Sequence, residues 1–223
     1  MGVQRWRAVF GGAILSTILL LPIPRPAAAQ ATDEPDPAAL LLSEADLPAG
    51  WHAWGGTPPE PLTQPGRLAA AAHCPELADL AAPPLAEAGQ AFVREHGQVA
   101  DTLEQAVAFY GPGAAEAQLL ALTGPLAACA GRGRGPTGAS GPSGTPVESW
   151  LEPLSVPDLG EDALVYASGE AGDFTNRDSL IAVVRRGDRA LLLIATAESF
   201  GRPALDREQA VAVLRLAVAR LES

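Results

Sequence analysis

Ile181-Ala-Val-Val-Arg-Arg-Gly-Asp-Arg-Ala-Leu-Leu-Leu-Ile194 contains two apolar runs separated by a short charged segment. The runs Asp178–Arg186 and Ala190–Ala197 are rich in leucine and β-branched residues, which favours strands. Arg186–Arg189 contains a Gly-Asp pair, which is typical of a tight turn. The stretch therefore predicts an antiparallel hairpin. We interpret its Arg-Gly-Asp tripeptide as part of the turn rather than as a cell-adhesion motif.

Further regular elements are predicted on both sides of this hairpin. Asp206 caps a helix that ends at Leu221, because apolar residues recur there at helical spacing. A second helix is predicted over Ala114–Ala130, and Leu103–Tyr110 fits a strand better than a helix. The remaining predicted strands are Ala91–Glu95, Val147–Leu154 and Ala163–Gly169. Together these elements predict an α+β fold, an antiparallel sheet of about five or six strands with helices packed against it.

The segments between these elements are expected to be irregular. Gly131–Pro146 is of low complexity and predicts a flexible surface loop. Leu68–Leu85 is rich in alanine and proline, which favours short helical turns around Cys74. The acidic segment 32–37 is expected to be disordered, so residues 38–223 are predicted to form a single domain.

The amino-terminal residues 1–31 have the order of a secretory signal peptide. Arg5 and Arg7 precede an apolar run over Ala8–Pro22, and small residues follow it. The run has about fifteen residues, whereas a membrane span needs roughly 20. Cleavage is expected after Ala29 or Ala31, and an uncleaved anchor is the alternative. We expect a soluble mature chain in an extracellular or periplasm-like space, with no stable membrane anchor after cleavage.

Cys74 and Cys129 are the two cysteines of the chain. An even number of cysteines in an exported protein predicts a disulfide between them. Two free thiols, or part of a metal site, are the alternatives.

The charge of the chain limits its partners. The formal net charge is −11, and cleavage would remove three arginines and no acid, which brings it to −14. Such an acidic surface repels phosphate backbones, so nucleic-acid binding is not expected. The chain has no lysine, which excludes Schiff-base chemistry and a Walker phosphate loop.

No segment has a catalytic signature, and we predict no catalytic residue, cofactor or metal. A Gly-x-Ser-x-Gly elbow is absent, and the three histidines are interpreted as surface or packing residues. The glycine pattern at Gly133, Gly135 and Gly138 lies in the predicted loop, so it does not indicate a dinucleotide site. Three oxygen-bearing residues close in sequence are interpreted as a solvated turn rather than a calcium site: Asp173, Asn176 and Asp178.

Three tryptophans are the candidate ligand-binding residues. Trp51 follows a turn that Pro48 and Gly50 impose, Trp54 lies in the next loop, and Trp150 lies in a predicted strand. Stacked tryptophans bind sugars or apolar ligands, although they more often cover the rim of a core.

A family resemblance accompanies these features. Leu41–Trp51, Cys74, the alanine-rich helix that ends in Cys129, and the hairpin 181–194 together resemble the extracellular sensor domain of mycobacterial PknH-type serine/threonine kinases and the exported or lipid-anchored proteins related to it. The resemblance implies an α+β domain with a ligand-binding cleft. The chain departs from this family in three ways: it has no kinase domain, no membrane helix beyond the leader, and one cysteine pair where members often have two.

The sequence thus predicts a secreted, non-enzymatic ligand-binding or sensor-like domain of the bacterial envelope. Its expected partner is an unknown small molecule or an envelope protein. Two alternatives stay open. One is a secreted hydrolase of envelope glycans, which would need two carboxylates about 5 to 9 Å apart. The other is a structural envelope protein that acts through protein contacts.

Overall fold

An antiparallel hairpin lies at the centre of the sheet, as the sequence predicted. Its strands are β7 (Asn176–Arg186) and β8 (Arg189–Ser199), joined by a turn in which Gly187 has a φ of +60°. That φ suits the first central position of a type II′ turn. The carboxylate of Asp188 accepts a hydrogen bond from the Gly113 N–H at 3.1 Å. The turn interpretation of the Arg-Gly-Asp tripeptide therefore agrees with the structure.

The structure is a computed structural model that describes residues 36–55, 65–78, 83–97, 99–130, 135–140, 146–159, 162–171, 176–199 and 205–223. The predicted signal peptide and its cleavage positions lie outside the described residues. Contacts group Pro35–Ser223 into one unit. Asp36 and Pro37 do not belong to a disordered segment: the Asp36 carboxylate accepts from the Ala38 N–H at 3.0 Å, and Pro37 is buried.

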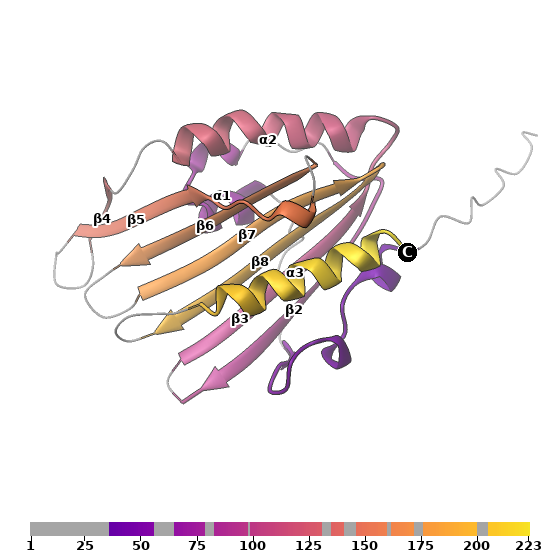
Figure 1. Cartoon of the computed structure of the whole chain (residues 1–223). Helices are drawn as coiled ribbons and strands as arrows, with labels where there is room; N and C mark the ends of the chain where they lie inside the picture. The colour runs from indigo at the N-terminus through magenta and orange to yellow at the C-terminus, as the bar shows by residue number, and fades with distance from the viewer. Residues whose placement is uncertain are drawn as a thin grey trace, which may run out of the picture. The chain divides into compact units, whose positions relative to one another are not determined.

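All eight strands form a single antiparallel sheet in the order β1-β2-β3-β8-β7-β6-β5-β4 (Figure 1). The α+β prediction is confirmed, and the strand count exceeds the predicted five or six because β1 and β4 were not expected. The other strands are β1 (His52–Ala53), β2 (Ala86–His96), β3 (Val99–Phe109), β4 (Gly135–Ser140), β5 (Pro146–Pro153) and β6 (Ala163–Ala171).

The prediction of a loop over Gly131–Pro146 is wrong in part, because Gly135–Ser140 forms strand β4. Gly135–Ser140 has no alternating apolar pattern that would mark a strand, so its backbone pairing with β5 defines it. β2 is also longer than the predicted Ala91–Glu95, because all eleven of its residues pair with β3.

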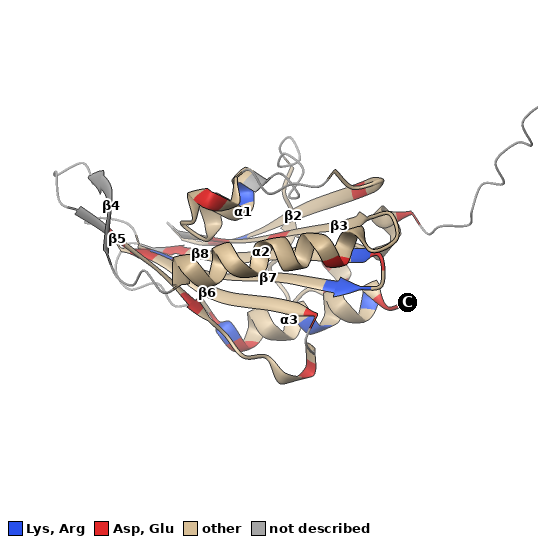
Figure 2. Cartoon of the chain, turned by 90° about the horizontal axis from the view of Figure 1, so that it is seen from above, with Lys and Arg blue, Asp and Glu red and all other residues tan. Residues whose placement is uncertain are grey.

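Helices cover both faces of the sheet (Figure 1). On one face α1 and α2 pack against the even-numbered residues of β8, and on the other face α3 packs against the odd-numbered residues. α2 carries a single charged residue, Glu116, whereas charges gather at the strand ends and on α3 (Figure 2). The helices and 3₁₀ turns are α1 (Pro65–Ala71), α2 (Ala114–Ala130), α3 (Arg207–Leu221), η1 (Pro37–Leu40), η2 (Glu44–Asp46), η3 (Pro75–Leu77) and η4 (Pro157–Leu159).

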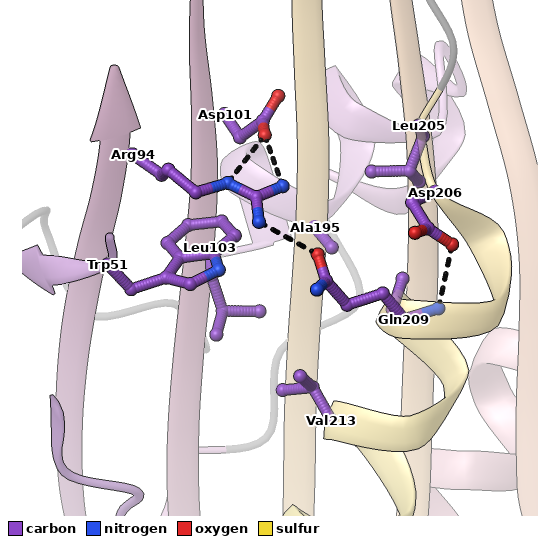
Figure 3. Close-up of a pocket in the computed structure, with 10 residues that line it drawn as sticks. Trp51, Arg94, Asp101, Leu103, Ala195, Leu205, Asp206, Gln209 and Val213 are labelled. Carbon is purple, nitrogen blue, oxygen red and sulfur yellow. Dashed lines mark hydrogen bonds and ion pairs between the residues drawn. The ribbon is translucent and has the colours of Figure 1, made fainter. Parts of the chain in front are cut away.

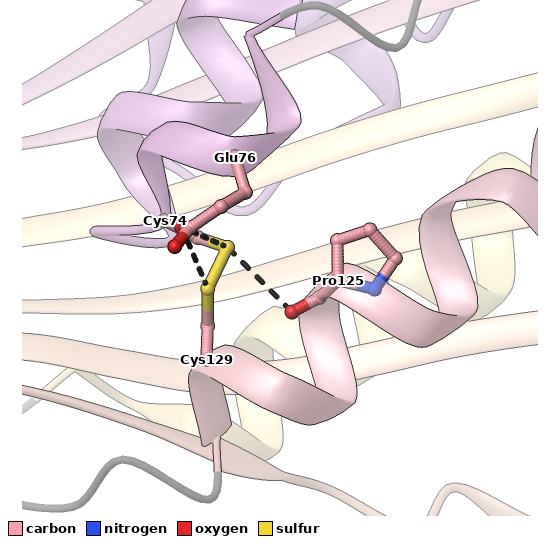
Figure 4. Close-up of a disulfide and its surroundings, with 4 residues drawn as sticks. All are labelled: Cys74, Glu76, Pro125 and Cys129. Atoms are coloured by element: carbon pink, nitrogen blue, oxygen red, sulfur yellow. Dashed lines mark hydrogen bonds between the residues drawn. A yellow bond between two sulfur atoms is a disulfide. The ribbon is translucent and has the colours of Figure 1, made fainter.

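The predicted disulfide joins Cys74 to Cys129, with the two Cα atoms 5.8 Å apart (Figure 4). Cys74 lies directly before η3 and Cys129 in the last turn of α2. The bond closes a separation of 55 residues, and a loop of that length contributes about 4 kcal/mol in the chain-entropy account, whose mechanism is disputed. It holds α2 and the α1–η3 segment together over one face of the sheet.

The amino-terminal segment is bound to the core by a buried amide. Gln105 of β3 is fully buried. Its Nε2 donates to the Leu42 carbonyl at 3.0 Å, and its Oε1 accepts from the Leu42 N–H at 3.1 Å. Because the side chain satisfies both backbone groups of Leu42, three consecutive leucines can pack beside α3 without leaving polar groups unpaired: Leu40, Leu41 and Leu42.

We predict that Gln105→Leu lowers the free energy of unfolding by about 2–4 kcal/mol, because it leaves two buried backbone groups without partners. Urea denaturation measures the change. Gln90→Leu is the matched control, since Gln90 is the half-buried register partner of Gln105 on β2. Equal losses for the two variants would contradict the role of the amide.

Asp46 links η2 to the last turn of α3. Its carboxylate accepts hydrogen bonds from the Ser43 N–H at 2.7 Å, the Ser43 hydroxyl at 2.6 Å and Arg220 at 2.6 Å. The bonds from Ser43, followed by Arg220, hold the pKa of Asp46 below its ordinary value, although desolvation opposes them. The folded state therefore favours the ionised carboxylate.

We predict that Asp46→Asn reduces the acid sensitivity of the fold. A carboxyl whose pKa is lowered on folding stabilises the protein above its unfolded pKa, and this contribution is lost as the pH falls through the folded value. Urea midpoints measured from about pH 6 down to about pH 3 should fall less steeply in the variant than in the native chain. Asp158→Asn, at a 72% exposed side chain, is the control and should leave the slope unchanged.

Candidate functional site

Trp51 stacks on an arginine at the edge of the sheet. The chain turns at Gly50, whose φ is +96°, and places the indole beneath Arg94 of β2, with the guanidinium carbon 4.9 Å from the ring centroid (Figure 3). A Cβ at position 50 would lie 3.6 Å from the Arg94 side chain, so the turn runs close beside it. The cation–π contact contributes roughly 0.5–2 kcal/mol. Trp51 is partly buried and packs against the apolar core on this face.

Arg94 connects β2 with β3 and with α3. Its Nε and Nη2 donate to Oδ2 of Asp101 at 3.0 and 2.6 Å, and its Nη1 donates to Oε1 of Gln209 at 3.0 Å. His96 Nε2 lies 3.0 Å from the same Asp101 oxygen. Gln209 is placed by the first turn of α3, where its backbone N–H donates to the Asp206 carboxylate at 3.0 Å. Arg94 is thereby held on three sides.

A small pocket between β2, β3, β8 and α3 is lined by Trp51, Arg94, Asp101, Asp206 and Gln209 (Figure 3). Its remaining lining is mostly apolar: Leu103, Ala195, Leu205, Ala210 and Val213. The enclosed space is about 20 Å³, enough for about one water molecule. The indole Nε1 of Trp51 is buried without a hydrogen-bond partner, and it lies on the side of the ring that faces α3.

Most polar side chains of the pocket already have hydrogen-bond partners within the protein. Asp101 and Asp206 already accept hydrogen bonds from within the protein, and the ten lining residues include no serine, threonine, cysteine or histidine. Trp51 Nε1 is a buried donor with no hydrogen-bond partner in the described part of the chain. An unpaired buried donor costs about 1–3 kcal/mol, so the pocket favours a ligand that supplies a hydrogen-bond acceptor.

A row of residues in register continues from this pocket across the sheet. On the α3 side, Asp101 pairs with Ala197, which pairs with Asp178. Gly169 and then Trp150 complete the row on β6 and β5. Asp178 is only 9% exposed and lies 3.5 Å from Arg207 at the start of α3. The interpretation of Asp178 as part of a solvated turn is therefore wrong, because it lies in β7 beneath α3.

The structure does not bring the three candidate tryptophans together. Trp150 lies five strand spacings from Arg94, or roughly 24 Å at about 4.8 Å per strand, which is too far for one small molecule to touch both ends. Trp54 is 49% exposed and follows β1. Its backbone N–H donates to the Ala91 carbonyl at 2.9 Å. Only Trp51 lines the pocket. Two other lining residues, Arg94 and Gln209, were not predicted from the sequence. The Asp206-x-x-Gln209 pattern does mark the start of a helix.

The other histidines lie away from this pocket's lining. His52 is exposed on β1, and His73 precedes Cys74 with a φ of +50°. Burial lowers the pKa of His73, so a neutral imidazole is favoured there, as befits a packing residue.

Comparisons with known proteins add a fold-level relationship. No protein-family profile matches the sequence, and no curated protein is significantly similar to it. Among solved structures, the extracellular domain of PknH from Mycobacterium tuberculosis matches with a TM-score of 0.52 at 12% sequence identity, over 82% of this chain and 94% of that chain. The resemblance expected from the sequence is thus confirmed for the fold, and membership of the family is not shown.

Among the described residues, no helix combines the length and the apolar character that a membrane crossing requires.

We predict that a methyl group added at Gly169, beside Trp150, destabilises the chain, and that one added at Gly124 has a smaller effect. A Cβ at Gly169 would lie 1.8 Å from Trp150 Cζ2, so Gly169→Ala must displace the indole and should cost about 1–3 kcal/mol. Gly124 in α2 has no atom within 4 Å of such a Cβ apart from its chain neighbours, and it precedes Pro125. The gain in helix propensity is opposed there by the proline ring, so Gly124→Ala is the control and should change the stability less than Gly169→Ala. Urea denaturation followed by tryptophan fluorescence measures both, and a neutral Gly169→Ala would contradict the packing.

Proposed function

We propose that this chain is an extracytoplasmic, non-enzymatic binding domain that holds a small molecule in the pocket beside Trp51. The observation that carries the proposal is the buried indole N–H, which faces an apolar pocket and has no acceptor. The export signal expected from the sequence and the fold shared with the extracellular domain of a kinase support an extracytoplasmic, sensor-like role. Any signal would pass to an envelope protein by contact.

The chemistry of the lining defines the class of ligand. Arg94 is balanced by Asp101, and Asp206, the N-cap of α3, adds a further acid to the lining. A charged anion would meet two carboxylates, whereas a neutral ligand would meet no net repulsion. A neutral carbonyl acceptor would pair with Trp51 Nε1, and an apolar body would pack against Leu103 and Val213. We therefore propose a neutral amide or ester with a short apolar portion.

Binding would require the first turn of α3 to move. The enclosed space of about 20 Å³ holds about one water molecule, far less than the several hundred Å³ of a typical ligand site. The hydrogen bond from Arg94 to Gln209 joins that turn to β2 and would have to open. A hydrogen bond to a charged group contributes about 1.5–3 kcal/mol, a cost that a ligand with several contacts can offset.

The test uses three probes that differ in charge and size. N-acetylglucosamine and hexanamide carry a neutral amide carbonyl, and hexanoate carries a charged carboxylate. We expect one or both neutral probes to raise the melting temperature and to change the tryptophan fluorescence of the purified chain, and hexanoate to do so less. Trp51→Phe retains a ring under Arg94 but removes the N–H, and it should weaken binding of the neutral probe about tenfold.

Trp54→Phe is the matched control, because Trp54 lies outside the pocket lining. It should bind the neutral probes as the native chain does. The proposal fails if neither neutral probe shifts the melting temperature, or if Trp51→Phe binds them unchanged.

A further inference from the structure

A carboxylate lies against both sulfur atoms of the disulfide (Figure 4). Oε2 of Glu76 is 3.7 Å from Cys74 Sγ and 3.5 Å from Cys129 Sγ. The Pro125 carbonyl oxygen is also 3.7 Å from Cys74 Sγ. The two sulfurs and one Glu76 oxygen all lie within 4.8 Å of one another. Two sulfurs and two oxygens thus converge on one small volume between η3 and α2.

The oxygens beside the sulfurs are hydrogen-bond acceptors that only the reduced cysteines can use. A disulfide has no S–H to donate, so the oxygens of Glu76 and Pro125 gain no hydrogen bond from it. After reduction, each thiol would face an oxygen acceptor. Two thiolates and a carboxylate are also a typical ligand set for zinc, which binds cysteine sulfur and carboxylate oxygen in tetrahedral sites.

We propose that Cys74, Cys129 and Glu76 form a zinc site when the disulfide is reduced. A dithiol reductant supplies two electrons and two protons, the S–S bond breaks, and the reductant is released as a cyclic disulfide. Zn²⁺ then replaces the two thiol protons, which go to the solvent. Three protein ligands leave the fourth tetrahedral position to water.

The surroundings explain why a cation is needed to complete the reduced site. Cys74 is fully buried, and so are the neighbouring side chains Leu77 and Leu126. Two thiolates beside the exposed carboxylate of Glu76 would bring three negative charges close together. A divalent ion neutralises most of that charge, and its affinity therefore rises with pH.

The geometry requires only a local change. Zinc–sulfur bonds of about 2.3 Å at a tetrahedral angle place two sulfurs about 3.8 Å apart. The Cα atoms of the two cysteines are already 5.8 Å apart. Rotation of the two cysteine side chains can separate the sulfurs while Glu76 stays beside them.

The test reduces the purified chain with a phosphine, which adds no competing thiol, and titrates it with Zn²⁺ under native mass spectrometry. We expect one zinc per reduced chain, with the loss of two protons, and none at that site in the oxidised chain. Glu76→Gln keeps both thiols and should weaken zinc binding at least about tenfold, an effect that loss of even an outer partner produces. Glu116→Gln on α2 is the matched control and should bind zinc as the native chain does.

A second measurement excludes binding to an unfolded dithiol. Zinc that binds the folded site should raise the melting temperature of the reduced native chain, and it should raise it less in Glu76→Gln. The proposal is overturned if the reduced chain takes up no zinc, if Glu76→Gln binds zinc as tightly as the native chain, or if zinc leaves the melting temperature unchanged.

Discussion

Burial of β8 on both of its faces requires two separate covers for the sheet. Every residue from Leu191 to Ala195 is buried, with odd and even positions facing opposite layers. Such a strand has no solvated side, so it is stable only if both faces are covered. The two covers differ in how they are attached. α2 is tied to its face by the covalent bond to Cys74, whereas α3 shares its face with the amino-terminal leucines, which Gln105 binds through hydrogen bonds.

This difference in attachment explains where the pocket lies. Beneath α2, the described side chains pack between the helix and the sheet, and the disulfide ties α2 to the segment before η3. The face beneath α3 is closed by two segments, and the first turn of α3 is joined to β2 through the single pair of Arg94 and Gln209. A helix end held by few contacts is the part of a fold that opens most readily. The pocket lies beneath this end.

The central elements could be predicted from the sequence because their signals are local. The continuous apolar runs of β7 and β8, the Gly-Asp turn and the helical spacing in α3 all lie within short windows. β4 and the first half of β2 could not be predicted, because Ala86–Gln90 has little β-propensity and gains its structure from pairing with β3. For the site, Trp51 was a candidate because it follows a turn. Arg94 and Gln209 are 115 residues apart, and nothing local in the sequence marks them as partners.

The strand register also determines where the apolar core ends. Phe92, Leu103 and Ala195 belong to one buried row on the α3 side, and the next row contains Arg94, Asp101 and Ala197 in the same register. Because α3 begins above this second row, side chains of its first turn pair with charged residues of the row. Gln209 pairs with Arg94, and Arg207 pairs with Asp178. The Trp51 N–H lies at this boundary without an acceptor, and the fold bears a cost of about 1–3 kcal/mol for it. Under the proposed function, an acceptor that entered the pocket would recover this cost, which would add to the affinity of the ligand.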